Sequence, residues 1–160
     1  MARLVVVLLA IVSAATAIGQ TAATCPWVAS GTAEHFLGGE VSLIAHIESN
    51  TAGSCTFTRQ GGKDASSIEI RVGSTDTHAC PRDSAPLKAL GNEAVQCRVG
   101  GAPSQTADRI SGRVRRVFFV VTMTNIPGAT KPEPSDPRLA DAYAASPLER
   151  LAEQVAGNLF

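Results

Sequence analysis

The chain has 160 residues, and 14 Lys and Arg residues balance 14 Asp and Glu residues, so its formal net charge at pH 7 is zero. A neutral total gives no electrostatic reason to expect nucleic acid or an anionic membrane as partner. Aromatic residues make up only 4% of the chain, so we expect a core built mainly from Val, Ile, Leu and Ala.

The first 17 residues have the order of a secretory signal peptide. A positive start at Arg3 is followed by an unbroken apolar run over residues 4–12, and residues 15–17 (Ala-Thr-Ala) match the small-x-small cleavage pattern. The apolar run is well short of the roughly 20 residues that span a bilayer. We therefore expect cleavage near Ala17, with a later cut after Ala23 as the alternative.

Cleavage divides the chain into three predicted parts. Residues 1–17 are the signal peptide, residues 18–24 are a flexible lead-in, and residues 25–160 form a single disulfide-bonded α+β domain, whose length is common for one domain. No second apolar stretch is long enough to span a membrane. The mature protein is accordingly expected to be soluble and exported, either secreted or periplasmic.

The first elements of the domain are a short helix and three strands. Ser30 as N-cap and Gly38-Gly39 as a stop predict a helix with Ala33, Phe36 and Leu37 on its buried side. Apolar residues then alternate over residues 40–49, and residues 54–59 and 67–72 repeat this period of two. Short Gly- and Asn-containing turns between them indicate an antiparallel meander.

The remaining elements are a loop, two strands and a helix. Residues 73–86 predict a long loop pinned by Cys80, which is the first candidate for a binding surface. A fourth strand is expected over residues 95–99, and the nearly continuous apolar run within 111–125 predicts a central strand covered on both faces. After a segment with four prolines, Ser146 as cap and Pro147 open an amphipathic helix. The fold class is therefore α+β, a mainly antiparallel sheet of about five strands with a short N-terminal helix and a C-terminal amphipathic helix packed on it.

The four cysteines, Cys25, Cys55, Cys80 and Cys97, all lie in the mature part, and an even number behind a signal peptide predicts disulfides. Four cysteines allow three connectivities, and the spacing does not choose among them. We favour Cys25–Cys55 and Cys80–Cys97, because each pair ties neighbouring elements. The chain has no C-x-x-C, and His78-x-Cys80 is not a zinc-binding spacing, so no metal is predicted.

The sequence contains no recognisable catalytic constellation. No G-x-S-x-G, H-E-x-x-H, P-loop or G-x-G-x-x-G pattern occurs. The three histidines, His35, His46 and His78, fall on a predicted helix, strand and loop, and disulfide pairing leaves no thiol as a nucleophile. We therefore predict that the protein is not an enzyme and uses no cofactor.

Two features are candidates for binding. Arginines gather where the strongest strand begins, and strand alternation would send Arg113 and Arg115 to one face and Arg116 to the other. They are either solvated strand-end charges or a docking site for an acidic protein or an anionic envelope polymer. The proline-rich segment 127–137 is either a linker or an extended recognition segment. The candidate binding residues are Arg109, Arg113, Arg115, Arg116 and His78.

The order of these motifs resembles a family of small actinobacterial exported lipoproteins that has no assigned function. The similarity lies in Cys25, the helix ending Phe36-Leu37-Gly38-Gly39, the Ser54-Cys55-Thr56-Phe57 strand, residues 90–94 (Leu-Gly-Asn-Glu-Ala) and the closing helix. The resemblance implies an α+β sheet with helices packed on it, and a Cys25–Cys55 bridge. Cys25 lies well beyond the apolar run and follows Thr24, which argues against a lipid anchor at this cysteine.

These observations favour an exported, non-enzymatic binding or accessory protein of the cell envelope or exterior, whose partner is an unknown protein or an envelope polymer. The alternative is an inhibitor-like protein that presents the loop around Cys80 to an enzyme, because a constrained loop loses little entropy on binding. An enzyme with an unrecognised site is the third hypothesis.

Overall fold

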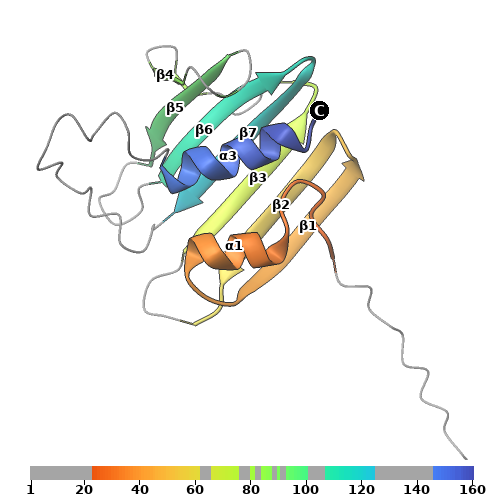
Figure 1. The fold of residues 1–160 in the computed structure, drawn as a ribbon, viewed down its shortest axis with the longest axis vertical. Helices are drawn as coiled ribbons and strands as arrows, with labels where there is room; N and C mark the ends of the chain where they lie inside the picture. The colour runs from red at the N-terminus through yellow and green to blue at the C-terminus, as the bar shows by residue number, and fades with distance from the viewer. Residues whose placement is uncertain are drawn as a thin grey trace, which may run out of the picture.

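The computed structural model describes residues 23–61, 66–75, 80–81, 84–87, 90, 93–100, 107–124 and 146–160. Within these residues, seven antiparallel strands form one sheet and two helices pack on one of its faces (Figure 1). The predicted α+β class is confirmed. The predicted signal peptide and the proline-rich segment lie outside the described residues.

The elements are α1 (Ser30–Leu37), β1 (Val41–Ser49), β2 (Ala52–Arg59), β3 (Ser67–Gly73), β4 (Ala85–Leu87), β5 (Ala94–Val99), β6 (Ala107–Val114), β7 (Val117–Thr124) and α3 (Pro147–Gly157). The sheet order is β1-β2-β3-β7-β6-β5-β4. Strands β1 to β3 form one antiparallel meander and β4 to β7 form a second. The two meanders meet where β3 pairs with β7.

The central position of β7 explains its nearly continuous apolar sequence. Phe119 and Val121 are fully buried on the side of the helices, and Val120 on the other side is also buried. A strand that is covered on both faces has a continuous apolar sequence rather than an alternation of apolar and polar residues. The predicted central strand is therefore confirmed for the segment Val117–Thr124.

The hydrophobic core lies between the sheet and the two helices. Helix α1 packs against β1, β2 and β3, and α3 lies across β6 and β7 (Figure 1). Cys55, Ile70, Val121 and Ile110 form one continuous row beneath the helices, because each pairs with the next across the sheet. The expected buried sides are confirmed at two residues of α1 and four of α3, whereas Phe36 and Leu159 are only partly buried and Ala156 is buried in addition. The confirmed residues are Ala33, Leu37, Leu148, Leu151, Ala152 and Val155.

Trp27 joins the N-terminal segment to the end of α3. Its side chain is fully buried, and its Nε1 donates a hydrogen bond of 2.8 Å to the carbonyl oxygen of Asn50. The Asn158 side chain donates through Nδ2 to the carbonyl oxygen of Trp27, also at 2.8 Å. These two bonds fix the segment before α1 between the first hairpin and the last helix.

Three details of the sequence prediction are wrong. The sheet has seven strands rather than about five, because the three-residue β4 contains Pro86 and is too short for a period of two to show. The predicted strand over residues 111–125 is a hairpin, since the chain turns at Arg115 and Arg116 and the preceding strand starts at Ala107. Ser30 is the first helical residue of α1, and Ala29 is the N-cap with no side-chain hydrogen bond.

Candidate functional site

The face of the sheet opposite the helices, which we call the distal face, carries mainly hydroxyl and charged side chains. Alternation along the strands directs these residues away from the core. On β1, β2 and β3 they are Ser42, Ile44, His46, Ser54, Thr56, Thr58, Ser67, Glu69 and Arg71, and on β6 and β7 they include Arg109, Arg113, Phe118, Thr122 and Thr124.

A depression of about 290 Å³ is hollowed into one end of the distal face. The register places His46 opposite Ser54, Ser54 opposite Arg71 and Arg71 opposite Val120, so one row crosses four strands. The polar and aromatic residues that line the depression are His46, Glu48, Ser54, Arg71, Thr75 and Phe118. Four strands from both meanders therefore contribute to one site.

Gly53 shapes the β1 side of this depression. It has a φ of 142°, and a Cβ at this position would lie 2.4 Å from the carbonyl oxygen of His46. The pairing of β1 with β2 shifts register between Ile47 and Ser49, opposite Gly53. A bulge of this kind re-aims side chains, and here it places Glu48 beside His46 in the lining.

The charged groups of the depression are accessible to solvent. Arg71 has Nη2 and Nε at 2.5 and 2.7 Å from Oε1 of Glu69, and the two side chains are 46% and 33% exposed. His46 and Glu48 are exposed. Glu69 thus orients the guanidinium along β3 while the group remains within reach of a ligand. The site combines the Arg71 guanidinium, the His46 ring and the Glu48 carboxylate with hydroxyl groups and one aromatic ring.

The structure divides the predicted arginine cluster between two places. Arg113 lies on the distal face, with Nη2 at 2.8 Å from Oε1 of Glu93 and its guanidinium 5.8 Å from the centre of the Phe118 ring. Arg115 and Arg116 form the turn of the β6–β7 hairpin, where Arg115 has a φ of 56° and lies over Phe160. The predicted alternation of Arg113 and Arg115 is wrong, because the strand ends at Val114.

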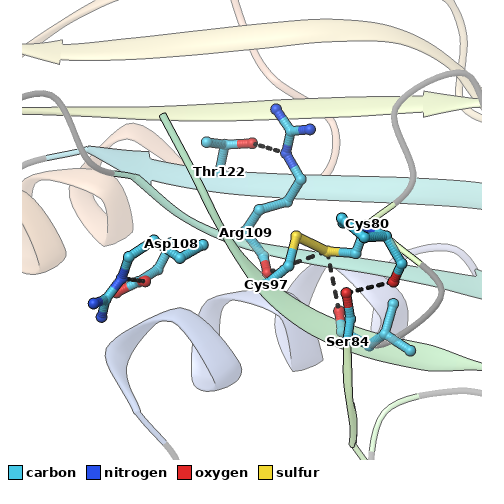
Figure 2. Close-up of a disulfide and its surroundings, with 9 residues drawn as sticks. Cys80, Ser84, Cys97, Asp108, Arg109 and Thr122 are labelled. Atoms are coloured by element: carbon cyan, nitrogen blue, oxygen red, sulfur yellow. Dashed lines mark hydrogen bonds and ion pairs between the residues drawn. A yellow bond between two sulfur atoms is a disulfide. The ribbon is translucent and has the colours of Figure 1, made fainter. Parts of the chain in front are cut away.

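Both favoured disulfides, Cys25–Cys55 and Cys80–Cys97, are present, and the second lies beside Arg109 on the distal face (Figure 2). Arg109 donates from Nε to Oγ1 of Thr122 at 3.1 Å, so it stabilises neighbouring strands. The bond from Cys80 to Cys97 attaches the start of the segment leading to β4 to strand β5, and the Cys80 sulfur lies 3.9 Å from the carbonyl oxygen of Val95 and 3.8 Å from that of Arg109.

The loop predicted as the first binding surface is described only in part. His78 and residues 76–79 and 82–83 lie outside the described residues. Ser84 donates a hydrogen bond to the carbonyl oxygen of Pro81 at 2.5 Å, which makes a local turn after the disulfide. Insertion of this loop into an enzyme stays a prediction.

Sequence reasoning did not select the residues of the depression. The period of two over residues 40–49 and 67–72 places His46 and Arg71 opposite the apolar residues of their strands, and therefore on the outer face. Their proximity to Phe118 depends on the pairing of β3 with β7, which are separated by three other strands in the chain. The signal for this site in the sequence was the set of polar, outward-facing residues on β1 and β3. The order of the strands in the sheet was not available from the sequence.

Comparison with family models, curated proteins and solved structures finds no match to this chain. In the described part of the chain, no three His, Cys, Asp or Glu side chains are grouped so that they could hold a metal ion. None of the described helices has the length and apolar character needed to cross a membrane.

Proposed function

We propose that this chain is an exported, non-enzymatic binding module of the cell envelope or exterior, and that it holds an anionic, hydroxyl-rich polymer in the depression of the distal face. The observation that carries the proposal is the lining itself. It brings Arg71 and His46 together with the Glu48 carboxylate, two hydroxyl groups and the Phe118 ring on one accessible surface.

These groups suit a sugar polymer that carries carboxylate or phosphate groups. A guanidinium binds such groups through paired, charge-assisted hydrogen bonds. The hydroxyls of Ser54 and Thr75 are able to donate to or accept from sugar hydroxyls, and the half-buried Phe118 offers an apolar surface for a sugar ring. The depression is open to solvent rather than enclosed, which accommodates a chain better than a small molecule that needs an enclosed cavity.

The exposure of the charged groups favours binding over catalysis. Enzymes place their acids, bases and charge-stabilising donors in sites from which water is excluded, since electrostatic interactions are stronger there. His46, Glu48 and Arg71 are all exposed to solvent. A surface that holds a hydrated polymer does not need such desolvation.

Two further observations support a place outside the cytoplasm. The structure contains two disulfides, which persist in oxidising compartments. The signal-peptide pattern of residues 1–17 and the resemblance to small actinobacterial exported lipoproteins agree with such a compartment. We propose a secreted or periplasmic protein without a lipid on Cys25.

Titration with two polymers tests the proposed ligand class. Oligomers of galacturonic acid supply hydroxyls and carboxylates, and dextran of similar length supplies hydroxyls alone. We expect binding of the acidic oligomers by isothermal titration calorimetry, and a loss of about tenfold in affinity for Arg71→Gln, since one charge-assisted hydrogen bond is worth about one factor of ten or more.

Arg98→Gln is the matched control, because it removes the same charge from another ion-paired arginine. Arg98 pairs with Asp108 at 3.1 Å, is 72% exposed and lies on the other face of the sheet. The affinity of the Arg98→Gln variant for the acidic oligomers should equal that of the unsubstituted protein. Equal losses for both variants, or no binding of the acidic oligomers, would contradict the proposal, and shortening of the oligomers during incubation would establish an enzyme instead.

A further inference from the structure

Strand β1 forms an edge of the sheet that is unusually apolar for its position. In the described residues it pairs only with β2. Of the three large apolar side chains exposed in the described part of the chain, two are on this strand, Ile44 at 61% and Ile47 at 40%. Edge strands are commonly protected by lysine, proline or inward-pointing charges, and β1 contains neither lysine nor proline.

The backbone groups of alternate β1 residues point outward from this edge. The Glu40 carbonyl accepts from the Gln60 N–H at 2.7 Å, whereas the Arg59 N–H donates to Ser66 on its other side. Arg59 is the partner of Val41, so Val41 does not form a hydrogen-bonded pair with β2. Val41, Leu43 and Ala45 consequently direct their N–H and C=O groups away from the sheet.

We propose that β1 is a self-association surface, on which a second copy of this chain adds its own β1 in antiparallel orientation about a twofold axis at Ala45. This register pairs the outward-pointing backbone groups of Ala45 with those of its symmetry mate. It also sets Leu43 opposite Ile47 of the second copy, so two apolar side chains meet on the side of the helices.

The charges on the strand argue against the two neighbouring registers. An axis at Ile44 would set Glu40 directly opposite Glu48 of the second copy, and like charges directly opposite destabilise a strand pair. An axis at His46 would set the exposed Ile44 opposite Glu48. The axis at Ala45 avoids both arrangements, because Glu48 then faces Ser42.

The pairing also completes the depression of the distal face. With the axis at Ala45, Ile44 of one copy is directly opposite His46 of the other, in a pair without mutual hydrogen bonds, where side chains lie closest. His46 lines the depression, so the second copy contributes an apolar side chain to its rim. A twofold axis perpendicular to the sheet places both depressions on the same face, and a long polymer would contact both.

Sedimentation equilibrium of the natively exported chain over a concentration series tests the dimer. We expect a monomer–dimer equilibrium that Ile44→Lys weakens about tenfold or more, because it removes an apolar side chain that the dimer would bury and adds like charges near the axis. Thr56→Lys is the matched control, since Thr56 is the β2 neighbour of Ile44 on the same face but does not lie at the edge. This control should associate like the unsubstituted protein.

Amide hydrogen exchange tests the register, because it measures which backbone N–H groups are protected. The N–H groups of Leu43 and Ala45 should become protected as concentration rises, whereas those of Ser42 and Ile44, which face β2, should be protected throughout. A monomer at every concentration, a dimer that Ile44→Lys leaves intact, or unchanged exchange at Leu43 and Ala45 would overturn the proposal. The polymer-binding test with Arg71→Gln uses short oligomers. Polymer binding and dimerisation are therefore measured separately, and either proposal is able to fail without the other.

Discussion

At the scale of single residues, Gly112 and Phe119 pack closely together in the second meander. The two residues are directly opposite on β6 and β7, and the Phe119 ring lies over the glycine in the fully buried core. A Cβ at Gly112 would be 2.6 Å from Cζ of Phe119 and 3.3 Å from the Cβ of Ala94. The glycine therefore provides the space that the aromatic ring occupies.

We predict that Gly112→Ala lowers the free energy of unfolding by about 1–3 kcal/mol, the usual cost of inserting an extra group into a packed core. Urea denaturation followed by circular dichroism measures this change. Gly31→Ala is the contrasting variant, because no atom lies within 4 Å of a Cβ at that position in α1. It should stabilise the protein by up to about 1 kcal/mol through helix propensity, and a larger loss for Gly31→Ala than for Gly112→Ala would contradict this account.

At the scale of elements, the capping of its first turn determines where α3 begins. The Ser146 hydroxyl accepts from the Glu149 N–H at 3.2 Å, and the Glu149 carboxylate accepts from the Ser146 N–H at 2.6 Å. This reciprocal capping box, with Pro147 as the first helical residue, satisfies two N–H groups that lack helical partners. The first turn thereby fixes where the buried side of α3 begins.

Ser146→Ala should reduce stability by about 1 kcal/mol, because the cap loses its hydroxyl acceptor. The loss is expected in chemical denaturation, while the m-value stays the same because the folded structure is unchanged. Ser146→Thr keeps a hydroxyl at this position and serves as the control. Identical unfolding midpoints for the alanine and threonine variants would show that the cap does not contribute.

At the scale of the whole molecule, each meander has its own disulfide. Cys25–Cys55 attaches the N-terminal segment to β2, and Cys80–Cys97 attaches the segment before β4 to β5. The two meanders are joined by the β3–β7 ladder and the shared core, and neither disulfide crosses this ladder. The cysteines thus restrain the two halves separately.

Replacing either pair by serine should destabilise the protein. The chain-entropy relation gives about 3.6 kcal/mol for the 30-residue separation of Cys25–Cys55 and about 3.1 kcal/mol for the 17-residue separation of Cys80–Cys97. Cys55 is also fully buried, whereas Cys80 is slightly accessible, so we expect the larger loss for the first pair. Guanidinium denaturation of the two double variants checks the order, and an unchanged midpoint for either would contradict it.

The sequence by itself determined the local features of this protein. The α1 stop at Gly38, the α3 start at Ser146 and the first three strands follow from turn residues, capping residues and periods that act within a few positions of the chain. The favoured cysteine pairs were also correct, although the spacing of the cysteines did not choose among the three connectivities. The helix ends and the first three strands need no information about distant neighbours.

Only the tertiary structure decided the strand order and the site that depends on it. The pairing of β3 with β7 brings Arg71 beside Phe118 and Val120, and this proximity arises from ladder hydrogen bonds between strands far apart in the chain. The position of β1 at the edge of the sheet has the same origin. Local patterns assign a side chain to a face, whereas packing between distant strands decides which side chains share that face and which strands lie at the edges of the described sheet.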